Sequence, residues 1–255
     1  MPYNLIFLDT ETTGNEAKDF LCQIAYAETS SADKLPELKD IVSKLYKPPV
    51  PIAFESMAVH HITTKMVADK PAFKYSLEHA ELHKKFENEN TIVVAHNAIF
   101  DLGMLKKEDL SPKKFICTLR LAHHLDTEEK ITSYKLQVLR YMLDLDVEAT
   151  AHDAGGDVLV LIKLFDRMYK KMLDKNNGDS EKTIEEMVEI SAKPILIRTF
   201  RFGKHNGKKV EEVAKTDRAY LEWLLAQKES AETDDVDWIF TLRTYLGKLD
   251  LKIKV

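Results

Sequence analysis

Residues 5–14 read Leu-Ile-Phe-Leu-Asp-Thr-Glu-Thr-Thr-Gly, an apolar run that ends in a pair of acids. Its first four residues form an apolar run typical of a buried strand. Residues two apart on an extended chain point to the same face, so Asp9 and Glu11 are expected side by side where the strand ends. Two such carboxylates repel one another unless a cation bridges them or one is protonated. For an isolated pair, two acids that face solvent would be the simpler interpretation.

The first 170 residues alternate apolar extended runs with amphipathic stretches, which predicts an α/β fold in which helices cover a sheet. The expected strands are Leu5–Asp9, Leu21–Ala27, Ile41–Tyr46, Thr91–Ala95 and Phe115–Thr118. The expected helices are Phe73–Phe86, Ile99–Lys106, Tyr134–Leu143 and Asp157–Lys171.

A second, smaller domain is expected after a polar segment. Lys170–Lys182 contains several turn-forming residues, which indicates a loop or linker. We therefore expect a first domain at residues 1–172, a linker at 173–196 and a small α+β domain at 197–255.

The small domain begins with a pattern that predicts a β-hairpin at Thr199–Lys208. Its Asn206-Gly207 pair favours the positive φ angles of a type I′ turn. Two helices, Arg218–Ala226 and Val236–Leu246, are expected to complete the domain.

Composition sets limits on the class of protein. The 255 residues are 44% hydrophobic, which is ample for a buried core, and they include two cysteines, Cys22 and Cys117, expected to be buried free thiols. We expect a cytoplasmic protein, because the amino terminus lacks a signal peptide pattern and no apolar stretch approaches membrane-spanning length. The net charge of −5 argues against a protein that coats nucleic acid by positive charge. It does not exclude a nuclease, because bound divalent cations return positive charge to an acidic site.

Two further segments carry residues suited to chemistry. Asp101 lies about one turn into a helix that follows the buried strand Thr91–Ala95, where it can reach the crevice at the strand ends. His152 can exchange a proton near neutral pH, and Asp157, five residues later, can reach a cation. Taken singly, each segment also fits capping residues: Asn97 and Asp101 at one helix start, and Asp157 at another.

Together the three segments resemble the three motifs of the DEDDh (DnaQ-like) exonucleases, the group that includes the proofreading epsilon subunit of bacterial DNA polymerase III and exonuclease X. The resemblance covers residues 3–170. Residues 58–63, Ala-Val-His-His-Ile-Thr, also resemble the Val-His-Gly-Ile-Thr stretch of the polymerase III-like members. His61 stands where glycine is usual, which affects the expected shape of this loop rather than the metal ligands.

The resemblance implies a ribonuclease H-like fold, a mixed sheet flanked by helices, and a 3′-to-5′ exonuclease that releases nucleoside 5′-monophosphates. It implies that two divalent cations, Mg²⁺ or Mn²⁺, are bound, with His152 as general base. The implied metal ligands, which are also catalytic, are Asp9, Glu11, Asp101 and Asp157. The expected substrate-binding residues are Thr10, Thr12, His96, Asn97 and Phe100, with core packing as the alternative for Phe100.

The expected partner is nucleic acid, with single-stranded DNA or frayed 3′ ends preferred, and no membrane. An RNA-trimming or RNA/DNA-tolerant enzyme is the alternative, because no residue shows whether a 2′-hydroxyl is accepted. A polymerase-associated proofreading or nucleic-acid-binding subunit is the alternative of another class.

The small domain resembles one found behind the nuclease domain of exonuclease X-like bacterial proteins. Its basic residues, interleaved with two phenylalanines, fit a grip on a single strand as well as they fit an ordinary hairpin with an aromatic core. These residues are Arg198, Phe200, Arg201, Phe202, Lys204, Lys208 and Lys209.

Overall fold

The computed structural model describes residues 3–145, 147, 154–230 and 235–248. The chain divides into two compact units, residues 1–191 and 192–255.

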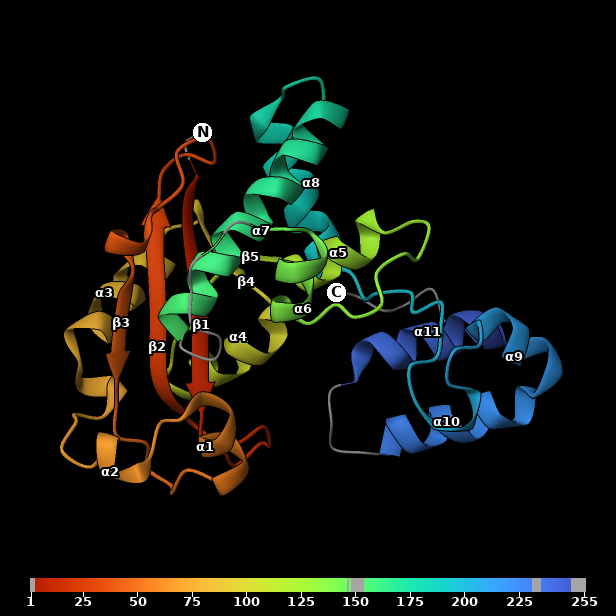
Figure 1. Cartoon of the computed structure of the whole chain (residues 1–255), viewed down its shortest axis with the longest axis horizontal. Coiled ribbons are helices and arrows are strands. Elements are labelled where there is room, and N and C mark those ends of the chain that lie inside the picture. The colour runs from red at the N-terminus through yellow and green to blue at the C-terminus, as the bar shows by residue number, and fades with distance from the viewer. Residues whose placement is uncertain (1–2, 146, 148–153, 231–234, 249–255) are drawn as a thin grey trace. The chain divides into compact units, whose positions relative to one another are not determined.

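The first unit is built on a five-stranded mixed sheet in the order β3-β2-β1-β4-β5 (Figure 1). The strands are β1 (Asn4–Thr12), β2 (Leu21–Thr29), β3 (Val42–Leu45), β4 (Thr91–Ala95) and β5 (Lys114–Cys117). Central strand β1 pairs antiparallel with β2 and parallel with β4. All five strands lie where the sequence predicts them, and the mixed sheet of a ribonuclease H-like exonuclease fold is confirmed.

Residues 5–8 of β1 are all apolar because both faces of the strand are covered there. Leu5 and Phe7 face a core that includes Phe165 of α7 (Ala154–Lys175), whose ring meets Phe7 edge-on at 5.1 Å between centroids. Ile6 and Leu8 face a second core, built with α3 (Leu77–Phe86) and α4 (Ala98–Lys107). The same alternation continues to the end of the strand, so the side chains of Asp9 and Glu11 point to one face and that of Thr10 points to the other.

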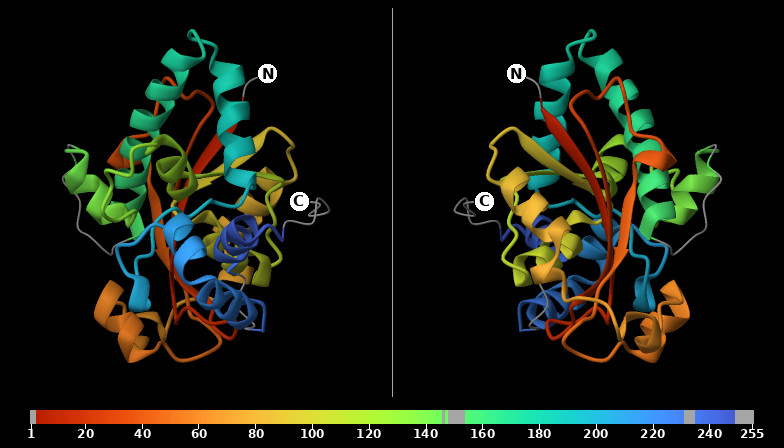
Figure 2. Two further views of the ribbon diagram at one scale, coloured as in Figure 1. Left: turned by 90° about the vertical axis from the view of Figure 1, so that its right-hand side faces the viewer. Right: turned by 90° about the vertical axis from the view of Figure 1, so that its left-hand side faces the viewer.

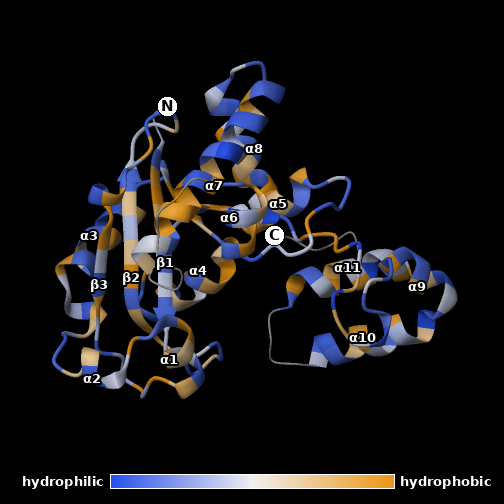
Figure 3. Cartoon of the chain, viewed as in Figure 1, coloured by the Kyte–Doolittle hydropathy of each residue, from blue (hydrophilic) through white to orange (hydrophobic). Residues whose placement is uncertain are grey.

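Helix α7 therefore covers one face of the sheet, and α3 and α4 cover the other (Figure 2). Figure 3 shows hydrophobic colours gathered in the sheet and on the helices against it. The remaining α-helices of the first unit, among its described residues, are α1 (Phe54–His60), α2 (Thr64–Val67), α5 (Thr118–Leu125), α6 (Leu136–Met142) and α8 (Ser180–Ala192).

The loop predicted at Lys170–Lys182 is present but much shorter, and most of the linker predicted at 173–196 is wrong. Helix α7 continues to Lys175 and α8 begins at Ser180, so residues 176–179 alone separate them. Helix α8 forms because Ile184 and Met187 are buried in the main core, which outweighs the polar composition of the segment. Residues 173–191 thus belong to the first unit.

The second unit is mainly helical in its described part, with α9 (Val210–Thr216), α10 (Arg218–Ser230) and α11 (Val236–Leu246) packed around Phe200. The predicted hairpin reduces to an isolated bridge between Thr199 and Lys209. The predicted type I′ turn is wrong. Asn206 has φ −50° and ψ 130° and Gly207 has φ +83°, which are the angles of a type II turn.

Both cysteines are buried and free, as expected. Within the described parts of the chain, we find no helix whose length and apolar content would let it cross a membrane.

Candidate active site

Three of the predicted acids converge at the end of β1. Carboxylate oxygens of Asp9, Glu11 and Asp157 lie within 4.8 Å of one another, although Asp157 comes from the first turn of α7. Ionised carboxylates at this spacing repel by about 3 kcal/mol per pair at an effective dielectric constant of about 20. A cluster of hard oxygen donors that is this costly without a cation fits Mg²⁺ or a similar ion.

The fourth acid, Asp101, lies outside this group of three. It is buried on α4, and its Oδ1 accepts hydrogen bonds from the backbone N–H of Thr10 at 3.1 Å and from the Thr10 hydroxyl at 2.7 Å. Burial raises the pKa of Asp101 to about 7, and the bonds from Thr10 act in the opposite direction. Asp101 is thus fixed against the residue between Asp9 and Glu11, while its role as a metal ligand stays a prediction.

Two residues that sequence reasoning missed support Asp157. Gln137, on α6, donates a hydrogen bond from Nε2 to Oδ1 of Asp157. Arg140 donates to Oε1 of Gln137 at 3.3 Å, which directs the amide N–H groups toward the carboxylate, and also donates to the carbonyl of Val147. No motif signals this arrangement, because it joins residues 20 positions apart on separate helices.

His152 lies outside the described residues, so its role as general base stays a prediction.

His96 is held by internal hydrogen bonds. Its Nε2 lies 2.7 Å from the carbonyl of Tyr134 and its Nδ1 lies 2.9 Å from the hydroxyl of Thr118. A carbonyl can only accept, so Nε2 carries the proton and Nδ1 accepts from Thr118. Burial lowers the pKa of His96 to about 4, which keeps the ring neutral. These contacts tie the end of β4 to the loop before α6.

A cavity of about 610 Å³ opens beside the acids. Three of the predicted substrate-binding residues, Thr10, Thr12 and Phe100, line it together with Glu11, whereas the predicted His96 and Asn97 are not among its lining residues. Exposed Asn97 adopts a left-handed conformation (φ 63°) before α4, and its side chain does not cap that helix. The other lining residues are Gly14, Asn15, Glu16, Lys18, Asp19, Ala53, Glu55, Ser56, Val59 and His60.

The loop after β1 forms one wall of this cavity and depends on a glycine. Asp19 accepts hydrogen bonds from the Thr13 hydroxyl at 2.7 Å and from the backbone N–H of Glu16 at 2.9 Å. A Cβ atom on Gly14 would lie 2.4 Å from Oδ2 of Asp19. The carboxylate can therefore approach the chain this closely because residue 14 has no side chain.

Helix α1 supplies the facing wall through His60, a residue the sequence did not single out. Its Nε2 lies 3.1 Å from the carbonyl of Thr12, and its Nδ1 accepts from the backbone N–H of Ile62 at 3.0 Å. The next residue, His61, has φ +61° at the C-terminus of α1. This left-handed conformation explains why glycine suits the position, and the chain keeps the turn with a histidine there.

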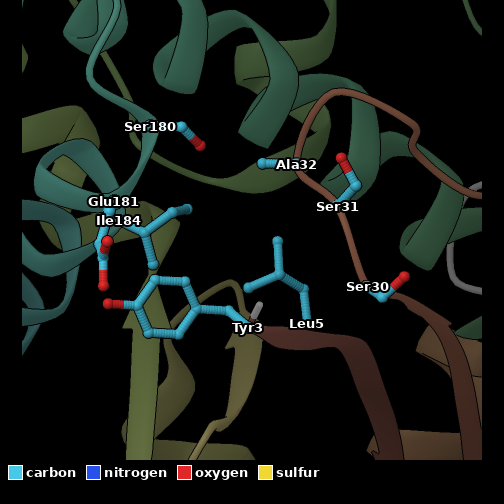
Figure 4. Close-up of a pocket in the computed structure, with 8 residues that line it drawn as sticks. All are labelled: Tyr3, Leu5, Ser30, Ser31, Ala32, Ser180, Glu181 and Ile184. Carbon is cyan, nitrogen blue, oxygen red and sulfur yellow. The ribbon is translucent and has the colours of Figure 1, made fainter. Parts of the chain in front are cut away.

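A second cavity, of about 250 Å³, lies at the opposite end of β1 (Figure 4). Tyr3, Leu5 and the beginning of α8 line it, and none of the predicted site residues does. Leu5 and Glu11 are six residues apart on one strand, which places this cavity roughly 20 Å from the acids. It is not part of the acidic site.

Comparison with known proteins agrees with this geometry. Residues 6–165 match the protein family described as Exonuclease, and residues 200–229 match the one described as Exodeoxyribonuclease X-like C-terminal. The chain is 32% identical to exodeoxyribonuclease 10 of Escherichia coli over 247 residues, which cover 95% of this chain and 98% of that protein. A DNA polymerase III subunit epsilon-like protein of Rhodobacter capsulatus is 32% identical over 173 residues, 64% of this chain and 23% of that protein.

Solved structures agree as well. Exonuclease X in complex with 5′ overhanging duplex DNA matches with a TM-score of 0.55 and 28% identity, covering 73% of this chain and 99% of that one. Escherichia coli exonuclease I with a dT13 oligonucleotide matches in fold, with a TM-score of 0.56 and 19% identity over 72% of this chain and 46% of that one. The chain belongs to the exonuclease family.

Proposed function

We propose that this protein is a 3′-to-5′ exonuclease that shortens DNA from single-stranded or frayed 3′ ends and releases nucleoside 5′-monophosphates. The observation that carries the proposal is the convergence of Asp9, Glu11 and Asp157 in a chain of the exonuclease family. The names of its relatives favour DNA: exodeoxyribonuclease 10, and exonuclease X solved with duplex DNA.

The donor set fits two divalent cations, Mg²⁺ or Mn²⁺, because carboxylate oxygens are hard ligands and hard cations prefer them. Such cations would supply charge neutralisation at the scissile phosphate and lower the pKa of a water. Asp9, Glu11 and Asp157 would hold them. Asp101, the fourth predicted metal ligand, would act from the other face of β1, where two hydrogen bonds from Thr10 hold its carboxylate.

The protein residues have separate tasks in this proposal. His152, five positions before Asp157, would accept the proton of the attacking water. Gln137 restricts the rotation of the Asp157 carboxylate through its hydrogen bond. In the cavity, Thr12 and the half-buried ring of Phe100 would contact the 3′-terminal nucleotide, whose base offers a flat surface for an aromatic ring.

A digestion assay with matched substrates tests the proposal. DNA and RNA 20-mers of one sequence, labelled at the 5′ end, are incubated with Mg²⁺, with Mn²⁺ or with chelator. We expect the DNA to shorten from its 3′ end in either metal and to stay intact in chelator. Faster shortening of the RNA would instead identify a ribonuclease, and shortening in chelator would reject the metal site.

A pair of variants on one helix provides the control. Asp157→Asn should lower turnover by roughly 100-fold or more, because it removes a charge from the cluster that would hold the cations. Asp166→Asn makes the same chemical change farther along α7, where Asp166 pairs with Lys170 at 2.8 Å, and should keep full activity. Equal activities of the two variants would contradict the proposed site.

A further inference from the structure

The second unit carries two exposed aromatic side chains, Phe202 and Trp223, that are not part of its core cluster. Phe200 is fully buried, and its ring meets those of Phe202, Tyr220 and Trp238 at centroid distances of 6.0, 5.8 and 5.1 Å. Trp223 lies next to Tyr220 at 5.6 Å. Around the buried ring, Phe202 is 37% exposed and Trp223 is 55% exposed. Large rings that remain this exposed beside a filled core are available for contact with a partner.

The same rings are accompanied by cations. Nζ of Lys204 lies 4.8 Å from the centre of the Tyr220 ring, and Nζ of Lys228 lies 5.9 Å from the centre of the Phe202 ring. Residues 194–210 contain five basic residues and no acidic one. The five are Arg198, Arg201, Lys204, Lys208 and Lys209. The segment that presents Phe202 is therefore positively charged.

Acidic neighbours remove part of this charge but not all of it. Asp217 pairs with Lys204 at 2.7 Å and accepts from Nε2 of His205 at 3.0 Å, which holds the segment against α10. Asp235 pairs likewise with Lys228 at 2.5 Å. Lys208, in contrast, is exposed at the type II turn.

We propose that Phe202, Tyr220 and Trp223, with the basic segment 198–209, form a binding surface for single-stranded DNA on the second unit. The bases would stack on the exposed rings, and the phosphates would lie near the lysine and arginine side chains. An acidic peptide would satisfy the charges but not the flat rings, and an apolar protein face would leave the five cations buried against it. The choice of DNA over RNA rests on the proposed function. Binding of a single strand by this surface does not require catalysis.

Tryptophan fluorescence tests this surface directly. Both tryptophans of the chain, Trp223 and Trp238, lie in the second unit, so the signal reports on this unit alone. In the full-length Trp238→Phe protein, Trp223 is the single emitter. Adding a (dT)20 oligonucleotide in chelator should quench its emission, and an abasic strand of the same length and charge should quench it much less. Equal quenching by both strands, or none by (dT)20, would overturn the proposal.

A binding measurement completes the test. Fluorescence anisotropy with labelled (dT)20 in chelator should show at least about tenfold weaker binding by the Phe202→Ala, Trp223→Ala double variant. Hydrolysis of the p-nitrophenyl ester of thymidine 5′-monophosphate, a one-nucleotide substrate for the acidic site of the first unit, should be unchanged. Unchanged binding by the double variant would overturn the surface. If the wild-type protein did not hydrolyse the ester at all, the proposed catalytic function would be overturned instead.

Circular dichroism provides the folding control for these variants, which should give the wild-type spectrum.

A variant of the first unit provides the specificity control. Tyr141→Ala removes an aromatic ring that is 73% exposed and should leave (dT)20 binding unchanged. An equal loss of affinity in Tyr141→Ala would show that the effect is not specific to the second unit.

Discussion

Thr10 donates two hydrogen bonds, from its backbone N–H and its hydroxyl, to one carboxylate oxygen of Asp101, 91 positions later in the chain. Its neighbours Asp9 and Glu11 point to the opposite face of β1 and meet Asp157 there. One strand therefore organises all four acids, three on one side and the fourth on the other. The short motif around residue 10 thus combines an acid pair that is predicted to bind metal with an anchor for a second helix.

The hydroxyl of Thr10 should be needed to hold Asp101. Thr10→Val keeps the shape of the side chain but removes this donor, and we expect a loss of about 1.5–3 kcal/mol in the free energy of unfolding at pH 8, where the carboxylate is charged. Turnover should fall as well. Thr10→Ser keeps the hydroxyl and should behave nearly as wild type. Urea titrations that show equal stability for the Val and Ser variants would contradict the anchor.

Gln137 should contribute to cation affinity without binding the cation itself. Gln137→Leu removes the donor to Asp157, and loss of such a supporting hydrogen bond typically weakens metal binding by roughly 10- to 100-fold. Titration with Mn²⁺, followed by electron paramagnetic resonance, measures this without turnover. Gln227→Leu, an exposed amide on α10, serves as control. Identical Mn²⁺ affinities in wild type and Gln137→Leu would exclude the positioning role.

The features that could be predicted from the sequence are those set by neighbouring residues. The apolar runs of β1 and β4 and the acid pair at Asp9 and Glu11 are local patterns, and the structure has them where they were expected. Helix α8 could not be found in this way, because its polar composition resembles that of a linker. Its buried residues, Ile184 and Met187, stabilise the helix by packing against core residues that are distant in sequence.

Side-chain partners far along the chain were also beyond local reasoning. The ring of His96 bonds to Thr118 and Tyr134, 22 and 38 positions later, and its place in a motif gave no sign of these partners. Gln137 carries no motif at all. Such pairings depend on how the layers pack, which a short pattern does not encode.

Gly14 should be required for the shape of the cavity. Gly14→Ala places a methyl group against the carboxylate of Asp19, 2.4 Å from Oδ2, and should displace the hydrogen bonds to Thr13 and Glu16. We expect a higher KM for DNA and about 1–3 kcal/mol of lost stability. Gly103→Ala is the matched control, because its added Cβ would have no atom within 4 Å and would favour helix α4. Equal effects of the two substitutions would contradict this account.

His61 should carry a small conformational cost that glycine removes. Its φ of +61° is unfavourable for a residue with a Cβ atom, so His61→Gly should raise the free energy of unfolding by up to about 1 kcal/mol. His61→Val should lower it, because a β-branched residue is the least suited to this conformation. Thermal unfolding of the three proteins measures the order, and a glycine variant less stable than the valine one would refute it.

The buried ring of His96 should make stability depend on pH below neutrality. Its pKa is lowered to about 4 in the folded protein, against 6.5 for the unperturbed group, so the unfolded chain binds more protons between these values. Stability from this residue is therefore complete above about pH 6.5 and is lost as the pH falls toward 4, by at most about 3 kcal/mol. Asp101, whose pKa is raised, makes stability fall as the pH rises over the same range.

The comparison of wild type with His96→Gln isolates the contribution of the histidine, since Asp101 is present in both. Denaturant titrations at pH 4.5 and 7.5 should show a smaller rise in stability with pH for His96→Gln than for wild type. Parallel curves for wild type and His96→Gln would show that the pKa of His96 is the same in the folded and unfolded chain, which would contradict the prediction.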